Sequence, residues 1–308
     1  MVDAKPVGDR VYLIDDNLYD IPESGSVYLL TGARNALIDT GPATSAEAVL
    51  TGIRQLGFQH TDIDYVIITH IHLDHSGGAG NLLKYLTRAK VLAHYKALKH
   101  LIDPSKLIAS AVAAQGESTL TRNGPVLPVQ ADKLAPVHDG DIIELDDHQA
   151  LTLIEAPGHA PHELCILESR NQGLFVGDAV GHFVDGTDVM IPVTPPPSFD
   201  MEQYVQTLNR LMKFQASRIY FAHAGTTLQA REQLAAAAEK LTERHAVITR
   251  AAAENKLDTA AEMLTEHICA ELSLLKTTRK ALYDFWTSVD IPMSAAAHVQ
   301  YYRKKQGL

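Results

Sequence analysis

Four side chains that can bind a metal ion lie within six residues of one another in the segment Thr69–Gly78. They are His70, His72, Asp74 and His75. Neutral imidazole and carboxylate groups are ligands of zinc and related divalent metals. So many polar groups are costly in a core unless each finds a partner. The segment therefore predicts a metal site.

The elements around this segment indicate how it is positioned. The apolar run Val66–Ile68 directly before it is typical of a short buried strand. Gly77 and Gly78 after it predict a turn into the next helix. The ligands would then lie at the carboxyl end of a strand, where open α/β sheets place their active sites.

Three later segments repeat this layout, in which a strand-like run precedes a metal-capable residue beside glycine. The runs and residues are Leu151–Glu155 before Gly158 and His159, Leu174–Val176 before Gly177 and Asp178, and Ile219–Ala222 before His223 and Gly225. Glycine lets the backbone turn sharply at a strand end and approach an ion closely. We therefore expect the distant residues to join the first four.

The ordered set, HxHxDH followed by GH, GD and a late His, resembles the metallo-β-lactamase superfamily over roughly residues 10–225. The resemblance implies an α/β (α+β) fold, an αββα sandwich with two metals at one edge. It implies that one metal is bound by His70, His72 and His159, the other by Asp74, His75 and His223, with Asp178 bridging both. Zinc is the expected ion, and iron and manganese stay open because His/Asp ligand sets accept several metals.

The function implied is that of a dinuclear metal-dependent hydrolase that uses a metal-bridging hydroxide to cleave an ester, thioester or lactone. Asp74 would also act in catalysis by relaying the proton. Within the superfamily the chain resembles the glyoxalase II, acyl-homoserine lactonase and PqsE-like thioesterase branches. The PqsE-like likeness rests on Gly177–Phe183, Ser198–Tyr204 and the helical tail, whereas lactonases carry tyrosine where this chain has Gly181. A phosphodiesterase, a single-iron thiol or persulfide dioxygenase, and a regulatory protein with vestigial hydrolysis remain alternatives.

Five other residues are candidates near the site. His182 follows Asp178 by four residues and is predicted to contact substrate or to act in catalysis. Phe183 and Tyr283 are predicted to bind substrate, although helix packing explains Tyr283 equally well. His162 and Asp39 are predicted to orient ligands; a loop position for His162 and a turn cap for Asp39 are the alternatives.

Composition and charge restrict the remaining functions. The net charge of −10 over 308 residues disfavours nucleic-acid binding, which needs a basic surface. No apolar run approaches the ~20 residues that span a bilayer, no signal peptide is evident at the start, and the two cysteines lack a disulfide or metal pattern. We expect a cytoplasmic protein with a small-molecule substrate, no nucleic-acid or membrane partner, and a homodimer left open.

The chain is predicted to divide into a catalytic domain, residues 1–227, and a helical region, residues 228–308, that covers the cleft or forms a dimer interface. Helical spacing predicts helices over 46–56, 81–87, 106–114 and 201–212. The segment Gln115–Gln130 is rich in Gly, Ser, Thr and Pro and is predicted to be a mobile loop or lid. Strands are expected at 11–14, 27–30, 36–38, 65–69, 91–93, 142–144, 151–155, 164–167, 174–176 and 218–222.

Overall fold

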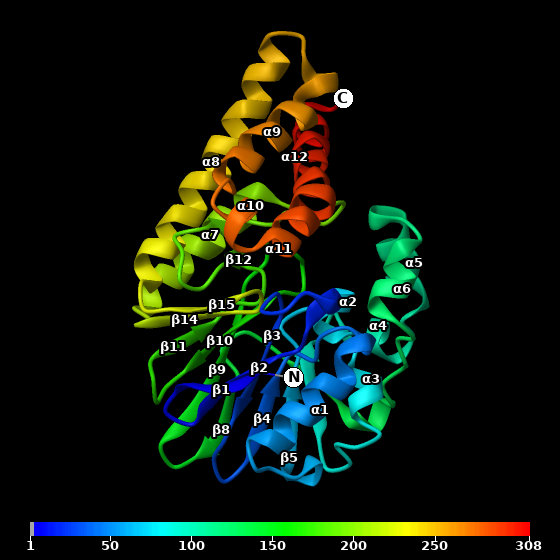
Figure 1. Cartoon of the computed structure of the whole chain (residues 1–308), viewed down its shortest axis with the longest axis vertical. Coiled ribbons are helices and arrows are strands. Elements are labelled where there is room, and N and C mark those ends of the chain that lie inside the picture. Colours follow the sequence, from blue (N-terminus) through cyan, green and yellow to red (C-terminus); the bar gives the residue numbers. More distant parts are fainter. Residues whose placement is uncertain (1–2) are drawn as a thin grey trace.

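The computed structural model describes residues 3–308 as two β-sheets packed face to face, with helices against both outer faces (Figure 1). The first sheet has seven strands in chain order: β1 (Ala4–Gly8), β2 (Val11–Asp15), β3 (Ser26–Leu30), β4 (Asn35–Ile38), β5 (Ile63–Ile67), β6 (Lys90–His94) and β7 (Leu134–Val137). Its first three strand pairs are antiparallel and its last three are parallel.

The second sheet has six strands, in the spatial order β15-β14-β11-β10-β9-β8. They are β8 (Ile142–Asp146), β9 (Gln149–Glu155), β10 (Leu164–Glu168), β11 (Gly173–Phe175), β14 (Arg218–Phe221) and β15 (Gly225–Thr227). A separate two-stranded ribbon joins β12 (His182–Phe183) to β13 (Met190–Ile191). The fold class predicted from the sequence, an αββα sandwich, is confirmed.

The two-residue period of the strands explains why the sheets stack. In β10, Leu164 and Ile166 belong to the core between the sheets, whereas Cys165 belongs to the core under the outer helices. In β5, Ile67 faces the second sheet and Val66 faces the helices on the other side. Each sheet is therefore apolar on both faces and needs cover on both.

The outer helices provide that cover. α1 (Ala46–Gln55) and the short α3 (Ala79–Leu82) pack on the first sheet, and α7 (Met201–Leu211) packs on the second. In α1 the buried residues Val49, Leu50 and Ile53 form one apolar stripe. The helix predicted over 81–87 is wrong in extent, because α3 ends at Leu82 and turns follow it.

Five helices follow the last strand and lie together beyond one end of the sandwich (Figure 1). They are α8 (Ala230–Ala253), α9 (Ala260–Glu271), α10 (Leu275–Thr278), α11 (Lys280–Phe285) and α12 (Ile291–Gln306), with a π-helical turn at Trp286–Asp290 before α12. Their apolar core includes Val184 and Ile191 from the β12–β13 ribbon. The helices therefore share buried surface with the sandwich; the predicted boundary at residue 227 stays a prediction.

A second helical segment stands beside α12 at the same end of the molecule (Figure 1). It contains α4 (Leu98–Ile102), α5 (Ser105–Gln115) and α6 (Ser118–Asn123), and α2 (Leu73–Ser76) lies at its base. No residue of α5 is buried although the helix is rich in alanine and aliphatic side chains. The loop predicted for Gln115–Gln130 is wrong in part, because α6 occupies its first half. Among the described residues no helix is both long and apolar enough to cross a bilayer.

Candidate metal centre

The strand ends deliver the predicted ligands to one edge of the sandwich. His70, His72, Asp74 and His75 follow β5, His159 follows β9, Asp178 follows β11, and His223 follows β14. Three or more of their ligand atoms lie within 4.8 Å of one another in several combinations. Residues separated by up to 153 positions in the chain are thus brought together, as the repeated strand-and-glycine layout predicted.

One group of donors consists of three imidazoles. His72 Nδ1 lies 2.8 Å from His70 Nε2 and 3.0 Å from His159 Nε2. The Oδ2 atom of Asp178 lies 3.5 Å from His159 Nε2 and 4.0 Å from His70 Nε2. These are the residues that the family resemblance assigned to the first metal, together with the bridging carboxylate.

A second group lies against the other side of Asp178. His223 Nε2 lies 3.2 Å from His75 Nε2, and the Oδ2 atom of Asp74 lies 3.7 Å from each of these nitrogens. Asp178 reaches this group as well, with Oδ1 at 3.4 Å from His223 Nε2 and Oδ2 at 3.6 Å from His75 Nε2. Its carboxylate therefore lies between the two groups.

The donor set fits two divalent cations. A tetrahedral zinc ion with Zn–N bonds of about 2.0–2.1 Å holds neighbouring donor atoms roughly 3.3 Å apart. The donor–donor distances within each group, 2.8–4.0 Å, bracket that value. Inward-facing imidazole nitrogens cannot all satisfy one another by hydrogen bonding, because each neutral ring has a single N–H. A positive ion between them resolves this conflict.

In His159, His223 and His75 the ring nitrogen that faces away from the centre is anchored to the protein. His159 Nδ1 donates to the carbonyl of Val193 at 2.9 Å, and His223 Nδ1 donates to the carbonyl of Ser24 at 3.2 Å. Because a carbonyl can only accept, the N–H of each ring is on Nδ1 and the lone pair of Nε2 points at the centre. His75 Nδ1 lies 3.0 Å from Asp39 Oδ2, so the structure places Asp39 beside His75; its role in orienting a ligand stays a prediction.

One anchoring residue was missed by sequence reasoning. Glu163 is fully buried, its Oε1 lies 3.4 Å from His70 Nδ1, and it accepts from the backbone N–H of Asp178 at 3.1 Å. Burial and the neighbouring Asp178 carboxylate raise the pKa of Glu163 well above its usual value. Its position directly after His162 in the segment that follows β9 is the signal that could have found it.

Electrostatics at the centre favour bound cations. Burial lowers the pKa of His159 and of His223 to about 3, so both rings are neutral at pH 7 and present lone pairs. Burial opposes ionisation of Asp178, but the surrounding His75, His223 and His159 hold its pKa well below the usual range. Burial also opposes charge on His75, yet Asp178 and Asp74 raise its pKa well above the ordinary value.

Gly158 shows why the layout needs glycine next to a ligand. Its φ is +143°, and an added Cβ would lie 2.3 Å from the Cα of Tyr204 in α7. Only glycine, which has no side chain, can occupy this position so close to the helix. The residue directly before His159 therefore lies against the backbone of α7.

A cavity of about 340 Å³ opens directly onto the donors. Its wall includes His72, Asp74, His159 and Asp178, and also His182, whose Nε2 lies 3.8 Å from Asp178 Oδ2. Asp290, from the π-helical turn, also lines the cavity and lies 3.9 Å from His182 Nδ1. No sequence pattern indicated Asp290. His182 thus lies in the cavity wall, within 4 Å of the carboxylates of both Asp178 and Asp290.

Three other predicted residues are placed differently. His162 lines the cavity, with its ring centroid 6.4 Å from that of His70, and it makes no hydrogen bond to a donor histidine within residues 3–308. Phe183 stacks on Phe221 in the core, with ring centroids 4.9 Å apart. Tyr283 packs against the core of the C-terminal helices. Phe183 and Tyr283 are not part of the cavity wall, so the structure does not bring them to the centre.

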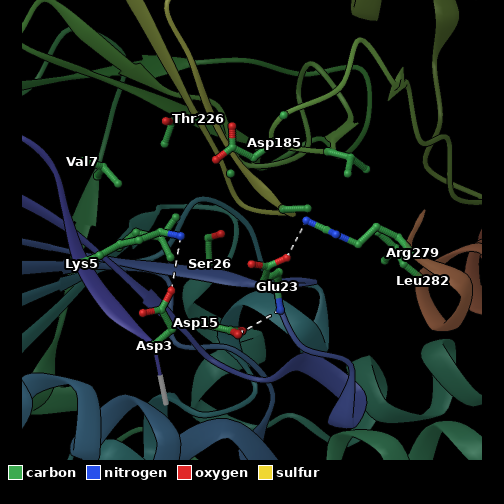
Figure 2. A pocket seen from close by; sticks show the side chains of 16 residues that line it. Asp3, Lys5, Val7, Asp15, Glu23, Ser26, Asp185, Thr226, Arg279 and Leu282 are labelled. Carbon is green, nitrogen blue, oxygen red and sulfur yellow. Dashed lines mark hydrogen bonds and ion pairs between the residues drawn. The ribbon is translucent and has the colours of Figure 1, made fainter. Parts of the chain in front are cut away.

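Figure 2 shows a second hollow, of about 180 Å³, that shares no lining residue with the first. Four of its charged side chains form two ion pairs: Arg279 lies 3.0 Å from Glu23, and Lys5 lies 3.3 Å from Asp3. Asp15 accepts from the backbone N–H of Glu23. Among the described residues these groups form no metal-donor cluster.

An αββα sandwich with His and Asp donors at the shared edge of its sheets defines a class of metalloproteins. Residues 20–223 match the family model described as the metallo-beta-lactamase superfamily, and the chain belongs to that superfamily. Its metal-centre residues are of the kind found in the hydrolases of this fold.

Individual relatives refine this placement. The archaeal protein ST1585 from Sulfurisphaera tokodaii is 31% identical over 210 residues, which cover 67% of this chain and 75% of that protein. The crystal structure of ST1585 aligns with a TM-score of 0.65 at 27% identity, over 76% of this chain and 86% of that one. The human acyl-coenzyme A thioesterase MBLAC2 is 26% identical over 225 residues, covering 68% of this chain and 75% of the relative.

A structure with lower identity shows the fold alone. The metallo-beta-lactamase family protein TTHA1429 from Thermus thermophilus aligns over 100% of this chain and 93% of that one, with a TM-score of 0.64 at 19% identity. The named relatives include thioesterases and do not point specifically to the glyoxalase II or PqsE-like branches. That finer part of the sequence-based prediction is not supported.

Proposed function

We propose that the protein is a dinuclear metal-dependent hydrolase of acyl thioesters. The observation that carries the proposal is the cavity, whose wall combines metal donors with a large apolar part. The apolar part of its wall comes from α5, the segment that follows β13 and the start of α12. It includes Leu107, Ala111, Ala114, Val193, Pro195, Pro196 and Met293. A volume of about 340 Å³ lies within the usual range for small-molecule sites.

The acyl chain of the substrate would lie between α5 and the proline segment Pro195–Pro197. Helix α5 buries none of its residues in the protein, so its apolar face has area left for a ligand to cover. Lys106 and His100 also line the cavity, and Lys106 is exposed to solvent. They would face the carrier part of the substrate, which in a coenzyme A thioester bears phosphates.

The metal ligands and His182 would have different roles in the reaction. Two bound cations would supply Lewis acidity and lower the pKa of a water molecule. His70, His72 and His159 would hold one, Asp74, His75 and His223 the other, with Asp178 between them. Attack forms the new C–O bond, cleavage of the C–S bond releases a thiolate, and Asp74 accepts the proton of the attacking water. His182 would hold the acyl group by a hydrogen bond from its ring.

A substrate panel tests the proposal. The metal-loaded protein would be assayed with acyl-coenzyme A thioesters, aryl esters, acyl-homoserine lactones and a phosphodiester, with His72→Ala as the inactive control. We expect the highest kcat/KM for thioesters. A higher kcat/KM for lactones or phosphodiesters would reassign the substrate class. Oxygen consumption with thiols by the iron-loaded protein would indicate a dioxygenase, and no turnover at all would favour a regulatory role.

A further inference from the structure

The segment Pro192–Thr194 links the C-terminal helices to a metal ligand. The carbonyl of Val193 accepts the N–H of His159 at 2.9 Å and so fixes the direction of that ring. Residues 192–194 are buried and follow β13 directly. What holds this segment in place therefore also sets the position of His159.

Both neighbours of Val193 are bound by the C-terminal helices. Arg244 in α8 donates to the carbonyl of Pro192. Ser294 in α12 makes two bonds to Thr194: its Oγ accepts from the backbone N–H of Thr194 at 3.2 Å, and its carbonyl accepts from the Thr194 hydroxyl at 3.1 Å. Figure 1 shows α8 and α12 in the group of helices beyond the end of the sandwich that carries β12. Three consecutive residues are thus bonded, in order, to α8, His159 and α12.

The environment of Arg244 sets it apart from an ordinary surface arginine. Its side chain is 1% exposed, and no carboxylate within residues 3–308 lies at ion-pair distance. Burial lowers its pKa to about 10, which leaves the guanidinium charged at pH 7. A buried charge is costly unless it is paired and hydrogen-bonded. The Pro192 carbonyl is its one protein acceptor in the described chain.

We infer that Arg244 and Ser294 are positioning residues for the metal centre, acting on His159 through the backbone of Pro192–Thr194. The C-terminal helices then have a role in metal binding as well as in shaping the cavity, whose wall includes the next residues, Pro195 and Pro196. This positioning role requires a metal bound at His159 but no particular substrate.

Metal affinity is the measurement that tests it. The two stepwise dissociation constants for Zn²⁺ would be determined by competition with a chelator, and the constant belonging to the site of His159 would be identified as the one lost in His159→Ala. We expect Arg244→Met to weaken that constant about 10-fold, in the range known for residues that orient ligands. The other constant should stay within about twofold, and Arg244→Lys should recover most of the loss because it retains a charged donor.

Two further variants keep the test decisive. Arg250→Met, at an exposed arginine of the same helix, should leave both constants unchanged. Ser294→Ala should weaken the same constant as Arg244→Met, and it carries the test alone if Arg244→Met fails to fold. Equal weakening of both constants, or no weakening of either, would overturn the inference. Because no substrate is involved, this outcome is separate from success or failure of the thioesterase proposal.

Discussion

Enlarging one side chain of α5 should shorten the acyl chain that the protein accepts. Ala111 lies in the cavity wall, and α5 buries none of its own residues, so Ala111→Phe places a ring in the cavity without disturbing a core. Ala113 is exposed, is not part of the cavity wall, and lies about 200° further round the same helix. Ala113→Phe is therefore a matched control.

The magnitude follows from the burial of methylene groups. Each CH₂ that leaves water contributes about 0.8 kcal/mol, so kcat/KM of the parent should rise roughly fourfold per added carbon until the cavity is filled. If the new ring displaces about three methylenes, the longest accepted chains lose ~2.4 kcal/mol, or roughly 60-fold in kcat/KM. Acetyl thioesters, which do not reach the ring, should be hydrolysed as before.

The assay is a chain-length series of acyl-coenzyme A thioesters, with release of the free thiol as the signal. The optimum should move to shorter chains in Ala111→Phe and stay in place in Ala113→Phe. Equal changes in the two variants, or an unchanged optimum in Ala111→Phe, would show that the acyl chain does not lie along α5. Loss of activity on every chain length would indicate damage to the centre, which the metal content of the variant would reveal.

Four other predictions concern single residues. Asp178→Ala should lose bound metal and hydrolysis together, as elemental analysis and turnover would show; full retention of both would refute the bridging assignment. Asp39→Asn should weaken the metal held by His75 about 10- to 100-fold in a chelator competition, while the other metal is retained. Lys106→Glu should raise KM for coenzyme A thioesters but not for thioesters of an uncharged thiol, and the difference should shrink at high salt. Burial raises the pKa of Asp290 to about 7, so the free energy of unfolding of the metal-free protein falls as the pH rises from about 4 through 7. Thermal melts of Asp290→Asn should therefore show a protein more stable than the parent at pH 8, by up to about 4 kcal/mol. Below about pH 4 the two proteins should be equally stable.

The metal donors could be predicted because their signal is local. His70 to His75, His159, Asp178 and His223 each follow an apolar strand within a few residues, and the strand ends must meet at one edge. The αββα arrangement came from the resemblance that these residues carry. The regular strands of the sandwich also show clear apolar runs, as in β9 and β10.

The remaining parts of the site depend on contacts that leave no mark in the sequence. Asp290 reaches His182 from a distant part of the chain, and its π-helical turn has no distinctive pattern. The carbonyl of Val193 is a backbone group and carries no side-chain signal. Helix α6 buries only Thr119 and Asn123, so it lacks the apolar stripe by which helices are predicted. β1 lies at the sheet edge and contains Lys5 and Pro6, so its sequence lacks the apolar run by which strands are predicted.

The metal donors in the cavity wall are held by buried contacts, whereas helix α5 on the other side of the cavity is not. We therefore expect the donors to determine the reaction and α5 to determine which substrates are accepted. The donors follow the ends of sheet strands. The outward ring nitrogens of His70, His75 and His159 contact Glu163, Asp39 and the carbonyl of Val193, all of which are buried. Helix α5 has no buried residue, so substitutions on the face that lines the cavity should change the free energy of unfolding little. The segment Pro192–Pro196 belongs to both sides, because the carbonyl of Val193 anchors His159 while Val193, Pro195 and Pro196 line the cavity. Substitutions in α5 should therefore alter substrate choice with the metals retained, whereas substitutions that release Pro192–Thr194 should change metal affinity and chain-length preference together.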